Sequence, residues 1–270
     1  MPCDHPACTV GICPYPDVMS GETLYHFGLI VLGTAAAVAC AVLLFISAPY
    51  GRHRRGGWGP EVNARAGWVL QEIPAPVVFA GVFFAGPWAM DAVPLIFFTL
   101  WEAHYVHRTF VFPFQLRIAG KRNPLVTVVL AFLFNVINAF VNAFALTHGA
   151  RYASTWPADP RCLLGITLFV AGYAINRHAD RILIRLRGPR ETGYRIPRGG
   201  LFRWLTSPNY FGEILEWWGW ALATWALPGL VFAIFTCANL IPRALSNHRW
   251  YREHFQDYPR ERWAVIPGVL

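Results

Sequence analysis

Charged residues are scarce in this chain, making up 14% of its 270 residues, whereas 55% of the residues are hydrophobic. Soluble domains usually carry about a quarter charged residues. The shortage of charge argues against a water-soluble globular domain and favours a protein whose solvent is a lipid bilayer. At roughly 20 residues for each membrane helix plus short loops, the chain is long enough for six to eight spans.

Several motifs of soluble proteins are missing as well. No G-x-G-x-x-G follows a strand, which excludes a Rossmann domain as the means of binding a dinucleotide. The chain contains neither an internal repeat nor a low-complexity segment. The formal charge of +8 does not form one long basic tract. It is spread over short runs between apolar segments, as in the cytoplasmic loops of membrane proteins, so we expect no nucleic-acid partner.

Three of the six cysteines, Cys3, Cys8 and Cys13, lie in an acidic segment ahead of the first apolar run. A disulfide can form there if the segment is extracytoplasmic, but the odd number leaves at least one thiol free or paired elsewhere. A metal site with His5 is conceivable, although the spacing is not one of the usual zinc spacings. We therefore expect no bound metal.

Seven apolar segments have the length and composition of membrane helices, and several contain proline or glycine, which such helices tolerate. Pro74 and Pro76 predict a bend in the second segment. Leu227-Pro228-Gly229 predicts a tight turn between the last two segments. The seven segments run approximately over residues 24–48, 68–86, 92–110, 124–147, 162–183, 210–227 and 229–245.

Basic residues alternate between the loops. They are concentrated after the first, third, fifth and seventh segments, whereas residues 86–91 and 227–229 contain none. Only an odd number of spans gives this alternation with an acidic N-terminus outside and a basic C-terminus inside. The sequence thus predicts an all-α integral membrane protein, a bundle of seven transmembrane helices oriented N-out and C-in. We expect residues 1–23 to form an extracytoplasmic tail and residues 24–270 a single transmembrane domain.

Ionisable side chains inside membrane spans are costly and indicate a functional site by default. In the second segment Glu72 is the candidate, with a cap at a helix N-terminus as the alternative interpretation. In the third segment Glu102, Tyr105 and Arg108 lie along one side of a helix, and His104 precedes Arg108 by four residues. The alternative for this group is a belt of side chains at the membrane interface.

Polar residues are also dense towards the C-terminus. Asn176 and Asp180 share one face of the fifth segment. Glu213 and Glu216 follow Asn209 at the start of the sixth, beside six arginines between residues 185 and 203. One of the two glutamates can be a helix cap and the arginines can be a topology signal. Together they favour a pocket for a polar ligand. Asparagines at 135, 138 and 142 are expected to make hydrogen bonds between helices.

All of these polar clusters lie at the cytoplasmic ends of the predicted spans. This arrangement suits an anionic soluble cofactor, because arginine binds phosphate bidentately, together with a lipid-like substrate that enters from the bilayer.

Five sets of motifs follow one another in this region. They are Leu70-Gln71-Glu72; His104-Tyr105-Val106-His107-Arg108-Thr109-Phe110; Tyr194-Arg195-Ile196-Pro197 with Gly199-Gly200-Leu201-Phe202; Asn209-Tyr210-Phe211-Gly212-Glu213-Ile214-Leu215-Glu216-Trp217; and His248-Arg249-Trp250-Tyr251 with Asp257-Tyr258-Pro259. In this order, over residues 68–270, they resemble the steroid 5α-reductase family. The family's His-rich run reads Ser246-Asn247-His248 here.

The resemblance implies a membrane-bound reductase that uses NADPH to reduce the C4–C5 double bond of a 3-oxo-Δ4-steroid. Motif by motif, it implies that Gln71, Glu72 and Tyr105 act at the substrate. It also implies a set of cofactor-binding residues: Arg117, Lys121, Asn176, Asp180, Arg187, Tyr194, Asn209, Glu213, Arg243, Asn247 and Tyr251.

The implied chemistry is addition of hydride to the β-carbon of an enone, followed by protonation of the α-carbon. Negative charge then develops on the carbonyl oxygen, and donors aimed at it lower the barrier most in a dry site. Tyr105 and a protonated Glu72 are the expected donors, Gln71 holds Glu72, and the proton comes from water or Tyr105. We expect a monomer in a bacterial inner membrane or the endoplasmic reticulum, with the cofactor site on the cytoplasmic side.

Other activities remain open at this point. The related enoyl-CoA, polyprenol and sterol reductases share the reaction type. Membrane isoprenylcysteine methyltransferases share a small bundle and a C-terminus rich in His, Arg and Tyr, but they use S-adenosylmethionine. A transporter or receptor would not need acid, Tyr and Arg clusters on one side.

Overall fold

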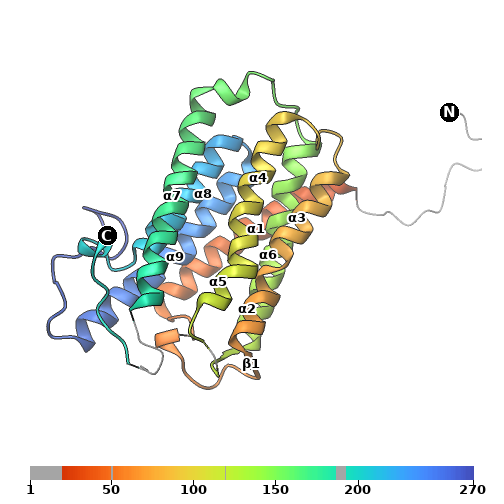
Figure 1. Ribbon diagram of the computed structural model, residues 1–270. Coiled ribbons are helices and arrows are strands. Elements are labelled where there is room, and N and C mark those ends of the chain that lie inside the picture. The colour runs from red at the N-terminus through yellow and green to blue at the C-terminus, as the bar shows by residue number, and fades with distance from the viewer. Residues whose placement is uncertain (1–19, 50, 119, 187–192) are drawn as a thin grey trace, which may run out of the picture.

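Each of the seven segments expected to cross the membrane contains helix in the computed structural model, which describes residues 20–270 except 50, 119 and 187–192 (Figure 1). The predicted tail with its three cysteines, and Arg187, lie outside the described residues. The helices are α1 (Gly21–Phe45), α2 (Ala64–Glu72), α3 (Pro74–Ala85), α4 (Ala92–Val106), α5 (Phe112–Gln115), α6 (Leu125–His148), α7 (Pro160–Arg185), α8 (Pro208–Thr224) and α9 (Leu227–His254).

Short elements connect the helices. A π-helical segment, His107–Val111, joins α4 to α5. Strands β1 (Glu61–Asn63) and β2 (Arg122–Pro124) pair antiparallel, with Glu61 opposite Pro124. This ribbon holds the beginnings of α2 and α6 side by side. Single 3₁₀ turns occupy Gly51–His53, Trp156–Ala158 and Gly200–Arg203.

Four helical stretches of the described chain are long and apolar enough to cross a membrane: α1, α2 together with α3, α6 and α9. The other three segments are shorter or carry more charge. Large apolar side chains are exposed on the outside of the bundle, including Phe27, Ile30 and Leu130. Extended apolar surface is unusual on soluble monomers, so the molecule is a mostly helical protein suited to lipid. That all seven segments cross, and in which direction, stays a prediction.

The bend predicted in the second segment is confirmed, since α2 ends at Glu72 and α3 begins at Pro74. Pro74 and Pro76 lack the amide hydrogen that continues a helix. Near the break, the Asn135 side chain of α6 donates to the Gln71 carbonyl at 2.7 Å. Helix α6 therefore fixes the end of α2, where Gln71 and Glu72 lie. The interhelical role expected for Asn135 is confirmed by this bond.

The turn predicted at residues 227–229 is wrong by a few residues. Helix α8 ends at Thr224, and α9 already begins at Leu227 with Pro228 in its first turn. Proline is tolerated there because the first helical amides have no intrahelical acceptor. The chain reverses instead at Trp225, whose φ of 47° is left-handed.

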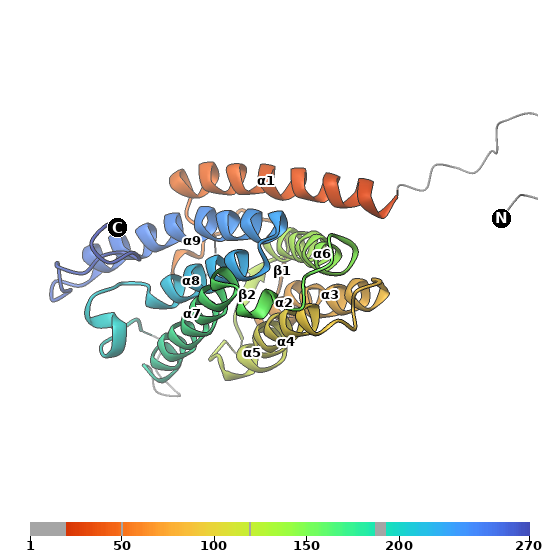
Figure 2. The same cartoon turned by 90° about the horizontal axis from the view of Figure 1, so that it is seen from above.

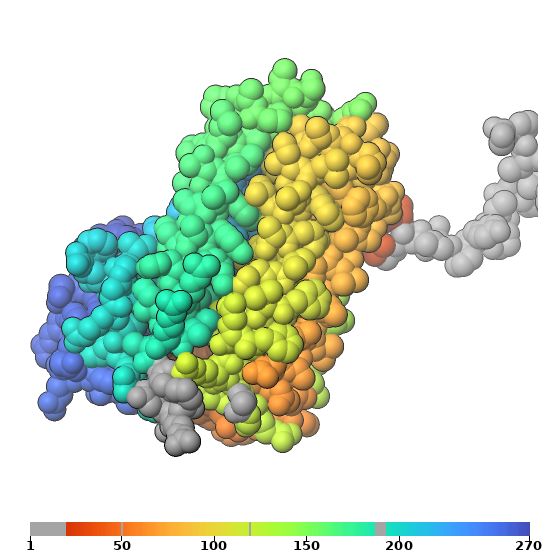
Figure 3. Space-filling model, viewed as in Figure 1, coloured from red at the N-terminus to blue at the C-terminus, as the bar shows by residue number. Residues whose placement is uncertain are grey.

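The bundle has two unlike faces. On one of them α1 lies against α9 and α6, as the view from above shows (Figure 2). On the opposite face α4 and α7 lie side by side and form the surface towards the viewer in the space-filling view (Figure 3). The basic loops and the segment after α9 gather at the end of the bundle where β1 lies (Figure 1).

Helices α7 and α8 pack backbone against backbone. A Cβ atom added at Gly172 of α7 would lie 2.4 Å from the Glu216 nitrogen, and one at Gly212 of α8 would lie 2.5 Å from the Asn176 nitrogen. Close helix contact through small residues is typical of membrane bundles. The contact repeats two turns away, with similarly short approaches, at Gly165 and Gly219.

Aromatic side chains fill the centre of the bundle around Trp101 of α4. This fully buried ring stacks on Phe79 with centroids 4.4 Å apart, and it contacts Trp217 and Trp220 of α8. Such ring pairs add stability beyond the area they bury. Tyr105 lies one turn further along α4, with its ring 4.8 Å from that of Trp101. The aromatic core thus fixes the position of a predicted site residue.

The glycine contact predicts a specific weakness. Gly172→Ala is expected to destabilise the protein by about 1–3 kcal/mol or more, because extra carbon in a packed contact forces the backbones apart. Gly81→Ala is the matched control, since nothing lies within 4 Å of a Cβ at that helical position. Thermal unfolding in detergent measures both variants, and equal midpoints would contradict this account of the α7–α8 contact.

Candidate functional site

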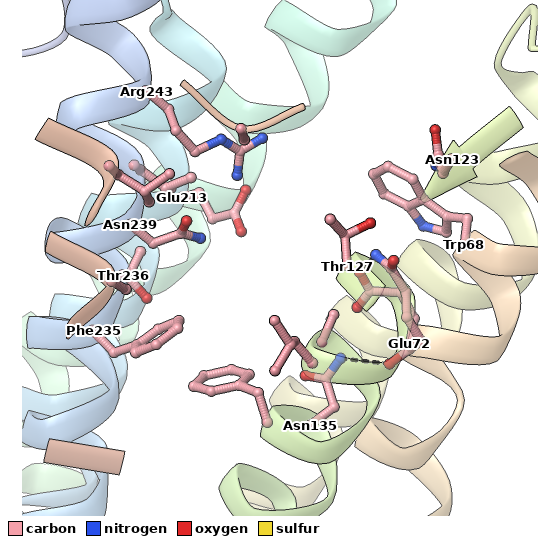
Figure 4. A pocket seen from close by; sticks show the side chains of 18 of the residues that line it. Trp68, Glu72, Asn123, Thr127, Asn135, Glu213, Phe235, Thr236, Asn239 and Arg243 are labelled. Carbon is pink, nitrogen blue, oxygen red and sulfur yellow. Dashed lines mark hydrogen bonds between the residues drawn. The ribbon is translucent and has the colours of Figure 1, made fainter. Parts of the chain in front are cut away.

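A cavity of about 410 Å³, here called the central cavity, lies between α1, α2, α4, α6, α8 and α9. Its two walls face each other in the close-up, with Glu72 and Asn135 on one side and Glu213 and Arg243 on the other (Figure 4). Apolar side chains of α1, α6 and α9 form much of its lining, whereas charged groups gather towards one end. This combination suits an apolar ligand with a polar end.

Arg108, in the π-helical segment after α4, connects the two walls. Its Nε lies 3.6 Å from Glu72 Oε1 and its Nη1 lies 3.6 Å from Glu213 Oε2. The Gln71 amide donates to Glu72 Oε1 at 3.3 Å. One guanidinium therefore links a carboxyl group of α2 to a carboxyl group of α8.

Behind Glu213, three polar residues join α7 to α8. Asn176 Nδ2 donates to the Asn209 carbonyl at 3.0 Å and approaches Glu213 Oε2 at 3.5 Å. Asn209 Nδ2 in turn donates to Asp180 Oδ1 at 3.3 Å. These bonds form directly beside the glycine contact of the two helices, so the close packing and the polar network are one arrangement.

Two further side chains of α4 face the central cavity. Tyr105 is 4% exposed and lies in van der Waals contact with aromatic rings, including that of Trp217, and its hydroxyl makes no hydrogen bond within the described residues. His104 Nδ1 and Glu216 Oε1 are 2.7 Å apart, and both side chains are buried. Tyr105 is thus available to donate to a ligand oxygen.

A second cavity of about 520 Å³, the basic cavity, adjoins the first. Both are lined by Trp68, Asn123 and Arg243. Further cationic side chains around the basic cavity are Arg52, Arg54, Lys121 and Arg122.

His53 also lines the basic cavity and shares a hydrogen bond of 3.2 Å between its Nε2 and Asn247 Oδ1. Burial lowers the pKa of His53, and the bond with Asn247 opposes that shift. The histidine is therefore biased towards its neutral form, so the arginines and Lys121 carry the positive charge of this cavity.

Arg52 packs into a group of aromatic rings at the wall of the basic cavity. Its guanidinium carbon lies 4.5 Å from the ring centroid of Tyr251, 5.0 Å from that of Trp250 and 5.4 Å from that of Tyr194. Cation–π contacts of this kind hold a guanidinium in place. Its Nη1 is buried and has no hydrogen-bond partner among the described residues, which marks it as a donor for a ligand.

The structure separates the predicted site residues into groups. Gln71, Glu72, Tyr105, Glu213 and Arg243 line the central cavity, and Lys121, Tyr194, Arg243 and Asn247 line the basic cavity. The others lie elsewhere: Asn176, Asp180 and Asn209 support Glu213 from behind, Tyr251 packs beneath Arg52, and Arg117 is exposed and borders neither cavity.

Sequence reasoning assigned no role to Arg52 or His53, and it noted His104, Arg108 and Glu216 only as members of polar clusters. The cap interpretations are wrong, because Asn63 caps α2 and Glu72 lies at its other end. Likewise, α8 begins at Pro208 and both of its glutamates bind partners on other helices. The four-residue spacing of His104 and Arg108 was the available signal that both face inward.

The chain is similar to known proteins over most of its length. A family model described as 3-oxo-5-alpha-steroid 4-dehydrogenase matches residues 121–270. The chain is 43% identical over 240 residues to 3-oxo-5-alpha-steroid 4-dehydrogenase 1 of Rattus norvegicus, which covers 88% of this chain and 92% of that protein. It is 42% identical over 239 residues to the protein of that name from Homo sapiens, covering 87% and 92%.

A plant protein is similar over a comparable length. The steroid 5-alpha-reductase DET2 of Arabidopsis thaliana is 38% identical over 261 residues, which is 93% of this chain and 98% of that protein. The similarity therefore extends over nearly the whole of both sequences.

Loss of the bridging guanidinium is expected to destabilise the fold. Arg108→Gln leaves two carboxyl groups without their shared cation, at a cost of about 3 kcal/mol. Arg54→Gln is the control, because its pair with Glu61 is exposed and costs about 1 kcal/mol or less to remove. Denaturation in detergent compares the variants, and adding Glu213→Gln to Arg108→Gln should restore part of the loss. Equal stability of the two single variants would show that the bridge is not structural.

Proposed function

The chain belongs to the 3-oxo-5-alpha-steroid 4-dehydrogenase family, and we propose that it uses NADPH to reduce the C4–C5 double bond of 3-oxo-Δ4-steroids. The observation that carries this proposal is the placing of Tyr105 and Glu72 in an apolar-walled cavity next to a basic one. An enone at the end of a flat apolar molecule matches the first cavity, and a phosphate-bearing cofactor matches the second.

The residues present fit a nicotinamide dinucleotide phosphate. Arginines and a lysine around the basic cavity are the usual partners of phosphate groups, and the buried, unpartnered Nη1 of Arg52 supplies an additional donor. Arg243 borders both cavities. A cofactor whose phosphates are held in the basic cavity can therefore extend its nicotinamide end into the central cavity. Arg52, Lys121, Tyr194, Arg243 and Asn247 are the described residues that would hold it.

NADPH, when bound, supplies the hydride that adds to the β-carbon. The protein's own contribution is to stabilise the charge that develops on the carbonyl oxygen, which Tyr105 does by donating its hydroxyl hydrogen. Glu72 donates to the same oxygen when it carries a proton, in which case the Arg108 cation is balanced by the Glu213 carboxylate alone. The Gln71 amide holds the Glu72 side chain in place. Arg108 keeps the carboxyl groups of Glu72 and Glu213 at a fixed separation.

The proposal also includes the architecture and the location of the protein. Residues 24–270 form one domain of seven transmembrane helices, oriented N-out and C-in, and the protein works as a monomer. The basic cavity then opens towards the cytoplasm, because the Arg-rich loops lie at that end. The membrane is the bacterial inner membrane or the endoplasmic reticulum, and the steroid enters the central cavity from the bilayer.

Two conservative substitutions test the proposed chemistry. Tyr105→Phe is expected to lower kcat/KM about a hundredfold, since it removes a donor to the developing oxyanion. Glu72→Gln is expected to lower it about tenfold or more, because an amide N–H is a weaker donor than a carboxyl O–H. The assay follows oxidation of NADPH and formation of the saturated steroid by mass spectrometry in membranes. Glu61→Gln and Tyr25→Phe, outside the central cavity, are matched controls. Near-normal turnover in both test variants would refute these roles.

Comparing NADPH with NADH, which lacks the 2′-phosphate, tests the proposed cofactor. We expect NADPH to exceed NADH in kcat/KM by about tenfold or more, because hydrogen bonds to a charged group contribute about 1.5–3 kcal/mol. Arg187, which lies outside the described residues, and the neighbouring arginines are the proposed partners of that phosphate. Thermal stabilisation by NADPH, but not by S-adenosylmethionine, is the accompanying binding test. Equal rates with NADH would contradict the assignment.

A further inference from the structure

We propose that His104 delivers the proton to the α-carbon of the substrate and that Glu216 is the positioning residue that keeps His104 able to do so. This inference rests on the proposed reduction of an enone, which needs one proton as well as one hydride. It gives a role to a buried pair that the oxyanion chemistry of Tyr105 and Glu72 leaves unused.

The pair is placed at the reacting end of the central cavity. His104 lines that cavity and precedes Tyr105 on α4, with their ring centroids 4.8 Å apart. A ligand whose carbonyl oxygen meets the Tyr105 hydroxyl therefore brings its next carbon atoms towards the imidazole. Tyr105 itself is aimed at the oxygen, two bonds from the α-carbon, and its proton is needed there to hold the charge.

Glu216 reaches His104 from α8, across the bundle. Its Oε1 lies 2.7 Å from Nδ1 of the imidazole, a distance typical of a charge-assisted hydrogen bond. The two side chains are 0% and 4% exposed. Because Nδ1 is occupied by the carboxyl group, Nε2 is the ring nitrogen left to serve a ligand. The carboxyl group thus selects both the orientation and the tautomer of the imidazole.

Glu216 also has an unusual environment for a merely structural acid. Its second oxygen, Oε2, is buried and has no hydrogen-bond partner among the described residues. A buried unpaired carboxylate oxygen is costly, and that cost falls when the carboxyl group shares a proton with the imidazole. The charged groups that act on His104 include the cations Arg108 and Arg177 and the acids Glu72 and Glu213.

The proton transfer balances as follows. Before transfer the pair holds two protons, one on Nε2 and one shared between Nδ1 and Oε1. The Nε2–H bond breaks, its proton forms the new C–H bond at the α-carbon of the enolate, and the electron pair of that bond remains on Nε2. One proton stays between Nδ1 and Oε1, and water from the polar end of the cavity returns the second before the next turnover.

Glu216→Gln is the decisive variant, because it keeps the shape of the side chain but cannot share a proton with Nδ1. We expect kcat to fall about a hundredfold, the usual worth of general acid catalysis, with KM for the steroid unchanged. Proton delivery should become rate-limiting, so the solvent deuterium isotope effect on kcat should rise. Glu102→Gln, a carboxyl group of α4 that does not line the cavity, is the matched control.

The outcomes separate this role from a structural one. A kcat near the wild-type value, or a lower kcat with an unchanged solvent isotope effect, would overturn the proposal. Wild-type protein from the same preparation is assayed first. If it reduces no enone steroid, the proposed function fails, whereas an active wild type with a near-normal Glu216→Gln contradicts only the present inference.

A second variant decides the question if Glu216→Gln does not fold. His104→Ala opens space beside Tyr105, and added imidazole should restore part of its activity by supplying the missing acid. Pyrazole has the same shape but is a much weaker base, so it should not restore activity. Equal rescue by both compounds, or rescue by neither in a variant that still binds NADPH, would overturn the assignment.

Discussion

Arg108 lies between two carboxyl groups that belong to different parts of the bundle. Glu72 ends a helix that the prolines of α3 interrupt, while Glu213 belongs to the α7–α8 pair, whose glycines bring the backbones into contact. Without the cation, two acids would face each other across an apolar cavity, which is costly in a medium of low polarity. The position of the cavity walls therefore depends on this bridge, and both cavities depend on the walls.

The glycine contact and the bridge support each other. Close approach of α7 and α8 brings Asn176 and Asp180 within hydrogen-bonding distance of Asn209, and these bonds hold the carboxyl group of Glu213 towards Arg108. Neither helix could present this set alone, because the donors and acceptors are divided between them. A larger residue in place of Gly165 or Gly219 is thus expected to push α7 and α8 apart and to weaken the hydrogen bonds around Glu213, two turns away.

Much of the fold follows from local sequence, whereas the pairing of polar groups does not. Hydropathy located the helical segments, and Pro74 located the break before α3, because these signals act within a few residues. The pairs of Glu216 with His104 and of Glu72 with Arg108 join residues far apart in the chain, which no spacing rule can reveal. Local sequence also misplaced the turn near Trp225. Pro228 is a common turn residue, but proline fits equally well in the first turn of a helix, where it lies in α9.

The two pairs divide the chemistry of one cavity. Glu72 is tied to a permanent cation, so the Arg108 bridge fixes geometry and charge at the carbonyl end of a substrate. Glu216 is tied to an imidazole, whose two nitrogens can exchange protons under mild conditions, so this pair can change its protonation during a reaction. One member of each pair lies on this part of the chain, His104 in α4 and Arg108 in the π-helical segment that follows it. A π-helical turn contains an extra residue, which alters which side chains face inward. The π-helical turn is therefore a physical reason why His104 reaches Glu216 whereas Arg108, one turn later, reaches Glu72 and Glu213.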